Sequence, residues 1–204
     1  RAPQPRIRPL GHHLTDSPLT DSPPDPLGAL GLVLTALVLL IAAHETTSSS
    51  LALSIITLLE HPEQMAKLHE DLDRLPKAIE ELLRYIATTD LVATRVAKGD
   101  IEIAGHHIKA GDAVLVSGTL ANRDTETHER ADELDVLRAD NHHVTFGFGI
   151  HQCLGQNLAR LELEIAMREL FTRIPDMRLS VPVDQLPILG SGTVQRVLSL
   201  PVEW

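Results

Sequence analysis

The stretch Phe146–Gly155, FGFGIHQCLG, holds the single cysteine of this 204-residue chain. Its glycines permit backbone conformations that bulky residues resist, and they let a flat group approach the main chain closely. We expect Cys153 to lie at the start of a helix, where unpaired N–H groups and the helix dipole favour a thiolate over a thiol. A thiolate there can ligate a metal or act as a nucleophile; a buried structural cysteine is the alternative interpretation.

His151, two residues before the cysteine, is near enough in sequence to act as a base for a cysteine nucleophile. A nucleophilic site also needs an orienting acid and an oxyanion-stabilising group, and no signature of either accompanies this pair. The pattern therefore lacks support for nucleophilic catalysis, and metal ligation and a buried structural cysteine both stay open.

A second chemical pattern is Glu45 beside Thr46 in the segment AAHETT, residues 42–47. The surrounding sequence is apolar, and a buried glutamate there costs free energy unless it is paired or protonated. Thr46 can donate a hydrogen bond to the carbonyl group four residues earlier. An acid and an alcohol side by side on a buried helix suit a proton relay; a solvent-facing patch is the alternative interpretation.

A third pattern is EELLR, which places Glu81 and Arg84 one helical turn apart. This spacing predicts an ion pair on one helix. By itself such a pair is expected at the surface, where it contributes little to stability.

Composition excludes several classes of function. A formal net charge of −10 and an aromatic content of 2% argue against nucleic-acid binding, which uses basic stripes and stacking side chains. One cysteine excludes an internal disulfide framework and fits a reducing, cytoplasmic compartment. The eleven histidines lack the spacing of a zinc finger.

The element that must carry Glu45 and Thr46 begins with the apolar run Leu27–Ala43. This run is shorter than the roughly 20 residues of a typical membrane-spanning helix. Apolar residues continue at helical spacing to Leu59, and His61–Pro62 ends the pattern. We therefore predict one buried helix of roughly 30 residues, with a membrane anchor as the less favoured alternative.

The remaining pattern predicts a mainly α fold with small β-sheets, an α+β class. Further helices are predicted at residues 63–72, 75–87 and 154–170. The last has an apolar stripe expected to be buried, formed by Leu154, Leu158, Leu161, Ile165 and Leu170. Short antiparallel strands are predicted at residues 92–97, 101–103, 107–108 and 113–116, and two or three more in residues 177–204.

Two parts are expected along the chain. Residues 1–26 carry seven of the 13 prolines and predict an irregular leader. Residues 27–204 predict a partial domain. Asn122–Asn141 is a long polar connection of the kind that usually has a functional reason.

Together these patterns resemble the cytochromes P450, the heme-thiolate monooxygenases, in their soluble bacterial form and over the carboxy-terminal half only. The cysteine stretch resembles their ligand loop, and Gln156–Arg160 continues it as bacterial members do. Ala42–Thr46 resembles their oxygen-activation segment. Glu81-x-x-Arg84 is similar to their glutamate–arginine motif, and Leu134-Asp135-x-x-Arg138 to the segment that supplies a second arginine.

The resemblance implies a role for each of these residues. Cys153 is the axial thiolate ligand of heme b, and Glu45 and Thr46 are catalytic residues that deliver protons on the opposite face of the heme. Arg95 and His151 hold the heme propionates, and Phe146, Gly147 and Gly155 complete the cofactor site. Glu81, Arg84 and Arg138 form a buried structural triad. Electrons come from NAD(P)H through a ferredoxin or flavoprotein reductase, and the substrate is a small hydrophobic molecule.

The chain also departs from the family. Ala43 stands where glycine is usual, Leu134 where phenylalanine is usual, and family members are roughly double this length. The resemblance thus implies a monooxygenase that inserts one oxygen atom from dioxygen into an organic substrate, present here as a truncated chain. The alternative is a non-catalytic heme-binding or interaction remnant. In either case we expect a large apolar surface of the long helix to be exposed.

Overall fold

The computed structural model describes residues 26–89, 91–190 and 194–204. The leader predicted for residues 1–26 lies outside these ranges except for Pro26, where helix α1 (Pro26–Glu60) begins. The chain divides into two units, residues 1–38 and 39–204, and the core and cavity described below belong to the second. The predicted domain boundary at residue 27 stays a prediction.

The long apolar helix is present as α1, and it is buried only toward its carboxy-terminal end. Leu58 is fully buried there, and Pro62 begins the next helix, α2 (Pro62–Glu70). Large apolar side chains from Leu27 to Ile41 are exposed, which confirms the expected apolar surface. This exposed part is helical although it is uncovered, because its leucine and alanine residues have high intrinsic helix propensity.

Within the described residues, one helical stretch, Leu27–Glu60, is long and apolar enough to cross a membrane, and an 18-residue window within it has a mean hydropathy of 2.3. Core helices of soluble proteins and signal sequences meet the same criterion. The stretch is therefore weak support for the membrane alternative.

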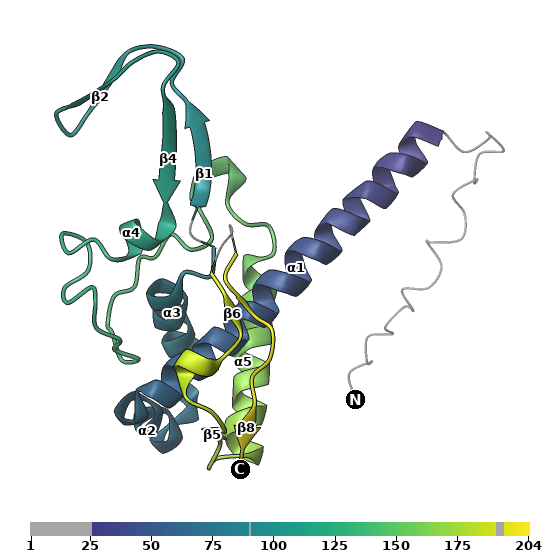
Figure 1. The fold of residues 1–204 in the computed structure, drawn as a ribbon, viewed down its shortest axis with the longest axis vertical. Helices are drawn as coiled ribbons and strands as arrows, with labels where there is room; N and C mark the ends of the chain where they lie inside the picture. The colour runs from purple at the N-terminus through teal and green to yellow at the C-terminus, as the bar shows by residue number, and fades with distance from the viewer. Residues whose placement is uncertain (1–25, 90, 191–193) are drawn as a thin grey trace, which may run out of the picture. The chain divides into compact units, whose positions relative to one another are not determined.

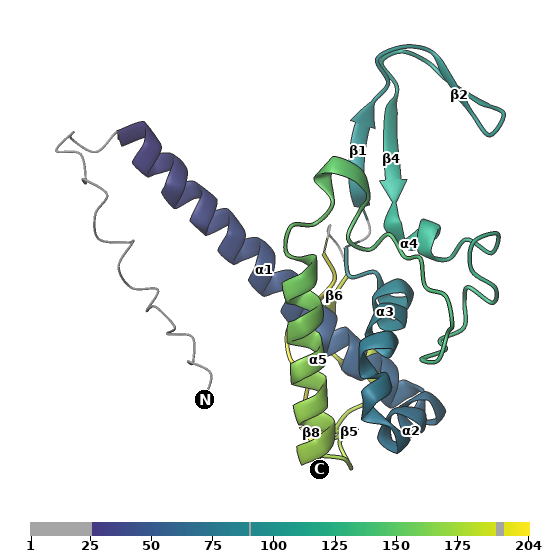
Figure 2. The same ribbon diagram turned by 180° about the vertical axis from the view of Figure 1, so that it is seen from behind.

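The core of the second unit is built on α3 (Leu75–Ile86) and α5 (Gln156–Arg173), which lie side by side in Figures 1 and 2. Leu75, Ile79 and Leu82 form one buried face of α3 at the spacing expected for a helix. The carboxy-terminal part of α1, together with α2, completes this core. A short 3₁₀ turn, η2 (Leu72–Arg74), joins α2 to α3.

The predicted buried stripe of α5 is wrong for four of its five residues. Leu154, Leu158, Leu161 and Ile165 are exposed, Leu170 is partly buried against the core, and the buried side chains are those of Leu163, Met167 and Phe171. Both sets follow helical spacing, so the sequence offers two apolar faces. The packing of α5 on α3 selects the second face. The helix also begins at Gln156, two residues later than predicted.

The predicted small antiparallel sheets are confirmed in the described residues, and each has two strands. β1 (Leu91–Val96) pairs with β4 (Ala113–Ser117), and β2 (Ile101–Ile103) pairs with β3 (His106–Ile108). In the tail, β5 (Arg178–Leu179) pairs with β8 (Val202–Glu203), and β6 (Ile188–Leu189) with β7 (Arg196–Val197), so the described part of the tail has four short strands where two or three were predicted. The mainly α class with small sheets is thus confirmed.

The long polar connection follows a helix that the sequence did not predict, α4 (Gly118–Asn122). Ser117 begins this helix by accepting a hydrogen bond from the amide of Leu120 at 3.1 Å. From α4 to the 3₁₀ turn η3 (Gly149–His151) the chain forms turns and bends without a regular element. A further 3₁₀ turn, η4 (Val183–Gln185), lies in the tail.

Candidate functional site

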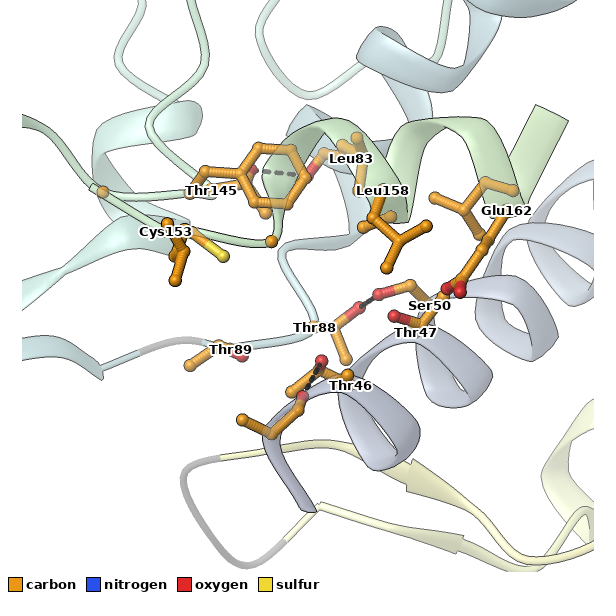
Figure 3. Close-up of a pocket in the computed structure, with 18 of the residues that line it drawn as sticks. Thr46, Thr47, Ser50, Leu83, Thr88, Thr89, Thr145, Cys153, Leu158 and Glu162 are labelled. Atoms are coloured by element: carbon orange, nitrogen blue, oxygen red, sulfur yellow. Dashed lines mark hydrogen bonds between the residues drawn. The ribbon is translucent and has the colours of Figure 1, made fainter. Parts of the chain in front are cut away.

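A cavity of about 390 Å³ lies between α1, the end of α3 and the segment 145–163 (Figure 3). One wall is the stretch 146–155, which we call the cysteine loop. The other wall is the part of α1 that contains Ala42, Ala43 and Thr46. Residues of the two patterns, distant in sequence, thus line one space.

The cysteine loop is shaped by backbone that glycine alone adopts easily. Gly147 and Gly149 have φ angles of 72° and 85°, in the left-handed region. The amide of Gly147 donates to the carbonyl oxygen of Val144 at 2.8 Å, and the amide of Cys153 donates to the carbonyl oxygen of Phe146 at 2.9 Å. These two hydrogen bonds close the loop and fix the backbone of the cysteine.

The thiol of Cys153 is free and exposed, and it lines the cavity. The alternative of a buried structural cysteine is therefore wrong. Cys153 was expected at the start of a helix; it lies three residues before α5, which begins at Gln156. A side chain carbon added at Gly155 would lie 4.0 Å from the sulfur, so the glycine leaves the space beside the sulfur open.

On the opposite wall, the hydroxyl of Thr46 donates to the carbonyl oxygen of Ala42 at 2.6 Å. This confirms the hydrogen bond predicted from the sequence. Because that bond uses the donor, the oxygen of Thr46 keeps its acceptor capacity. Thr46 is therefore a polar group on an otherwise small-residue wall.

The expectation that Glu45 is buried is wrong. Its side chain is 37% exposed and forms an ion pair with Arg196 of β7, with Nη1 and Oε1 2.7 Å apart. Consecutive side chains on a helix point about 100° apart, so Glu45 turns to the β6–β7 side while Thr46 lines the cavity. Arg196, from the carboxy-terminal tail, therefore neutralises the charge of the Glu45 carboxylate.

Of the residues expected at the heme, Phe146, Gly147, His151 and Gly155 line the cavity. Arg95 does not belong to this group. Its side chain is exposed on β1, and its Nη1 donates to the carbonyl oxygen of its neighbour Thr94 at 3.0 Å. The structure thus brings the cysteine loop and Thr46 together and places Arg95 outside the cavity wall.

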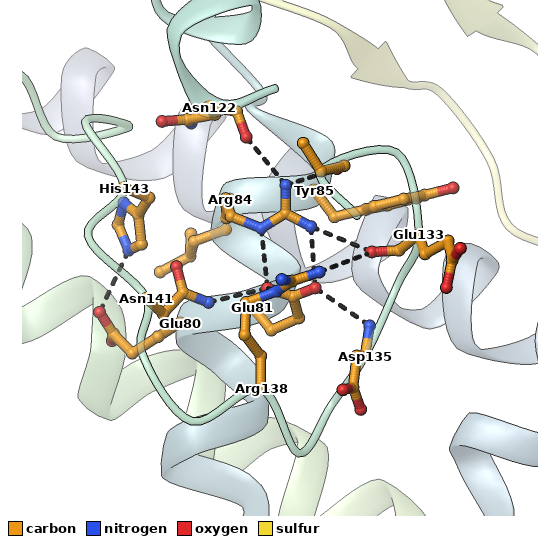
Figure 4. Close-up of polar contacts among 12 residues, drawn as sticks. Glu80, Glu81, Arg84, Tyr85, Asn122, Glu133, Asp135, Arg138, Asn141 and His143 are labelled. Carbon is orange, nitrogen blue, oxygen red and sulfur yellow. Dashed lines mark hydrogen bonds and ion pairs between the residues drawn. The ribbon is translucent and has the colours of Figure 1, made fainter. Parts of the chain in front are cut away.

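Glu81, Arg84 and Arg138 meet in one buried cluster (Figure 4), which we call the glutamate–arginine cluster. Arg84 donates to both carboxylate oxygens of Glu81 at 2.8 Å, and Nε of Arg138 donates to Oε2 at 3.0 Å. The side chains of Glu81 and Arg84 are 1% and 0% exposed, so the surface-pair interpretation is wrong. Asn141 and the amide of Asp135 supply two further hydrogen bonds to the carboxylate.

The charges of this cluster determine the ionisation of its carboxylate. Burial raises the pKa of the Glu81 carboxyl, but the hydrogen bonds from Arg84 and the Asp135 amide outweigh burial and leave the pKa below its ordinary value. Glu81 is therefore an anion held between two cations.

The two arginines also hold the polar connection by its backbone. Arg84 donates to the carbonyl oxygens of Asn122, Ala131 and Glu133. Arg138 donates to those of Glu129, Arg130 and Glu133. The irregular chain that leads to the cysteine loop is thereby tied to α3.

Sequence analysis missed a buried pair of hydroxyl groups in the cavity wall. Ser50 and Thr88 are hydrogen bonded at 2.8 Å between α1 and the turn that follows α3. Ser50 lies one helical turn after Thr46, a spacing that could have marked it as part of the same face. No signal in the sequence points to its partner.

Comparison with known proteins agrees with this geometry. A model of the family described as Cytochrome P450 matches residues 13–175. The chain is 54% identical over 173 residues to the vitamin D3 dihydroxylase of Streptomyces griseolus, a match that covers 85% of this chain and 43% of that protein. It is 43% identical over 173 residues to a mycinamicin VIII C21 methyl hydroxylase of Micromonospora griseorubida, covering 85% and 44%.

Solved structures give the same picture. The crystal structure of cytochrome P450 MoxA from Nonomuraea recticatena matches with a TM-score of 0.82 at 48% identity, covering 86% of this chain and 43% of that one. The chain therefore spans less than half the length of the relatives that it matches.

Proposed function

Since the chain belongs to the cytochrome P450 family, we propose that it is part of a heme-dependent monooxygenase. The proposed reaction inserts one oxygen atom from dioxygen into a small hydrophobic organic substrate. The observation that carries the proposal is that the free thiol of Cys153 and the hydroxyl of Thr46 line one cavity.

The residues of this cavity fit a heme. The thiol of Cys153 is a soft metal ligand, and the α1 wall across the cavity is formed largely by alanine, serine and threonine side chains. A single soft protein ligand suits a metal that brings its other ligands with it, as the iron of a heme does. Gly147, Gly155 and Ala159 line the side of the thiol, so a flat group can approach the backbone there. When bound, the heme supplies the oxygen chemistry, and a thiolate ligand favours O–O cleavage.

The chain's own groups take the remaining roles. Cys153 holds the iron through its sulfur. The half-exposed carboxylate of Glu45 takes up a proton from water and gives it to Oγ1 of Thr46, which passes its own proton into the cavity. This role requires the carboxylate to leave Arg196 during the transfer.

His151 and Arg95 are proposed to hold the heme propionates by charge-assisted hydrogen bonds. His151 already lines the cavity. Arg95 is exposed and has one backbone partner, so a rotation of its long side chain is needed to reach a carboxylate.

Electrons are proposed to come from NAD(P)H through a ferredoxin or a flavoprotein reductase. The single cysteine fits a reducing, cytoplasmic compartment.

A carbon monoxide difference spectrum tests the heme assignment directly. The chain is mixed with hemin, reduced with dithionite and exposed to carbon monoxide. We expect the strongly red-shifted Soret band of a thiolate-ligated heme in the wild type and its loss in Cys153→Ala, with His107→Gln, at an exposed position of β3 outside the cavity wall, as a control. The same band in both proteins would contradict the role of Cys153.

A second candidate function is heme binding without turnover. It is favoured by the exposed apolar side chains of α1 between Leu27 and Ile41, since an uncovered helix leaves a site open to water. Substrate-dependent NADPH oxidation with a ferredoxin and its reductase separates the two candidates. Heme binding with no turnover supports the second, and product formation coupled to NADPH supports the first.

A further inference from the structure

Glu80 is the neighbour of Glu81, yet it faces a different set of partners. Its carboxylate accepts hydrogen bonds from Nε and Nη2 of Arg160 at 2.7 and 3.0 Å. Nε2 of His143 lies 3.1 Å from the same carboxylate, a contact drawn in Figure 4. The paired guanidinium and carboxylate join α3 to the first turns of α5 and fix the plane of the Arg160 guanidinium.

That guanidinium lies over the ring of Phe146, the first residue of the cysteine loop. The central carbon of the Arg160 guanidinium is 4.5 Å from the ring centroid, within the range of a cation–π contact. The ring of His143 lies 5.9 Å from the same centroid, tilted by 50°. Phe146 is thus held by two side chains that both contact Glu80.

Phe146 in turn holds the backbone of the cysteine. Its carbonyl oxygen accepts the hydrogen bond from the amide of Cys153 at 2.9 Å. Arg160 also donates to the side chain oxygen of Gln156, the first residue of α5, at 3.0 Å. One guanidinium therefore contacts residues on both sides of Cys153.

We propose that Arg160, held by Glu80, is a positioning residue for Cys153. The guanidinium fixes the Phe146 ring, and the Phe146 carbonyl oxygen fixes the Cys153 amide. The position of the Cys153 backbone in turn sets the direction in which its thiol points. In the proposed monooxygenase this sets the direction from which the sulfur meets the iron, so this part of the inference rests on the proposed function. The positioning of the amide does not depend on heme.

The competing explanation is an ordinary ion pair that joins α3 and α5. Replacing Arg160 with lysine distinguishes the two explanations, because arginine and lysine carry the same charge on groups of different shape. Lysine can keep the ion pair with Glu80, but it lacks the planar group that covers an aromatic ring while donating two parallel hydrogen bonds. A charge-only role is preserved in Arg160→Lys, and a stacking role is not.

Amide hydrogen exchange of the heme-free 204-residue chain, followed by NMR, provides the first test. In Arg160→Lys and Arg160→Met we expect the Cys153 amide to exchange about tenfold faster, while amides of the α3 core keep their rates. The matched control is Arg173→Met, because Arg173 forms an exposed ion pair with Glu169 on the same helix with Nη2 and Oε2 2.7 Å apart. This control should leave the Cys153 amide unchanged.

The exchange rates in each variant distinguish a positioning role of Arg160 from an ordinary ion pair and from a general loss of stability. Wild-type exchange of the Cys153 amide in Arg160→Lys would overturn the proposal in favour of the ion pair. Equal acceleration of the α3 amides would overturn it in favour of a general loss of stability. Glu80→Gln, which keeps the size of the side chain, should accelerate the same amide to a smaller extent.

A second measurement uses the heme-loaded chain. With carbon monoxide bound to the reduced heme, we expect Arg160→Lys to convert part of the red-shifted Soret band to the band of a heme without a thiolate ligand, and Arg173→Met to keep the wild-type spectrum. An unaltered spectrum in Arg160→Lys would overturn the heme part of the proposal. If the wild type binds no heme, the proposed function fails, and the exchange experiment still decides the positioning of Cys153.

Discussion

Nε of Arg138 donates to Oε2 of Glu81 at 3.0 Å, a contact between residues 57 positions apart in the sequence. Arg84 holds the same carboxylate from within α3. The cluster therefore joins the polar connection to a helix of the core, and removing its single anion leaves two cations facing each other.

Glu81→Gln should reduce the free energy of unfolding by about 3–5 kcal/mol, because Arg84 is then a buried charge without its counterion. Urea denaturation followed by circular dichroism measures the change. Glu169→Gln is the control, since Glu169 pairs with an exposed arginine and should cost less than about 1 kcal/mol. Equal effects of the two substitutions would show that the cluster is not a stabilising unit.

Glu80 predicts a pH dependence of stability. Burial alone raises its pKa, but hydrogen bonds from His143 and Arg160 lower it from 4.5 to about 2. Folding thus favours the carboxylate, and the stabilisation is complete above pH 4.5 and lost as the pH falls toward 2. The shift corresponds to roughly 3 kcal/mol.

Urea titrations from pH 6 to 2 of the wild type and Glu80→Gln provide the measurement. The difference in unfolding free energy between them should shrink as the solution becomes more acidic. A difference that is constant over this range would mean that the Glu80 carboxylate has no special environment.

Leu58→Ala should destabilise the chain by about 2–5 kcal/mol, because the side chain is fully buried at the carboxy-terminal end of α1. Leu40→Ala on the same helix should cost less than about 0.5 kcal/mol, since Leu40 is exposed. Chemical denaturation of both variants checks the contrast. A large cost at Leu40 would show that the exposed part of α1 is covered in solution.

Ser50→Ala should cost about 1–3 kcal/mol, because it leaves the buried hydroxyl of Thr88 without its partner. Ser48→Ala is the control on the same helix, since Ser48 is exposed and bonds only to backbone carbonyls one turn earlier. Thermal unfolding of the two variants compares them. Similar midpoints would argue against a role of the hydroxyl pair in stability.

Thr46→Val should lower product formation by roughly 10²-fold in a preparation that turns over, because it removes the group proposed to pass a proton. Thr46→Ser should retain most of the activity, since it keeps a hydroxyl at the same position. The carbon monoxide spectrum should be the same in both variants, which separates proton transfer from heme binding. Full activity of Thr46→Val would exclude the proposed relay.

The sequence predicted the elements well where a local pattern determines them. The helices and hairpins follow from periodicity and glycine spacing, and the hydrogen bond from Thr46 to Ala42 is a contact within one helical turn. The cysteine loop was recognisable for the same reason, because its glycines and cysteine occupy one short stretch. In each case residues close together in the sequence determine the local structure.

The predictions of burial from the sequence failed where a residue distant in the sequence determines whether a side chain is buried. The buried face of α5 is the one that contacts α3, although both apolar faces follow helical spacing. Glu45 was expected to be buried, and an arginine from the tail pairs with it near the surface. The contact between Arg160 and Glu80 joins residues 80 positions apart and has no local signature.

Arg84 and Arg138 hold the polar connection through its carbonyl oxygens, and every amino acid has a carbonyl oxygen. The path of this segment is therefore determined by two arginines, Arg84 in α3 and Arg138 within the segment, more than by its exposed side chains. Its exposed side chains are free to drift during evolution, while either arginine is intolerant of change. A deep mutational scan should accordingly show that exposed positions of the segment tolerate substitution, while Arg84 and Arg138 do not.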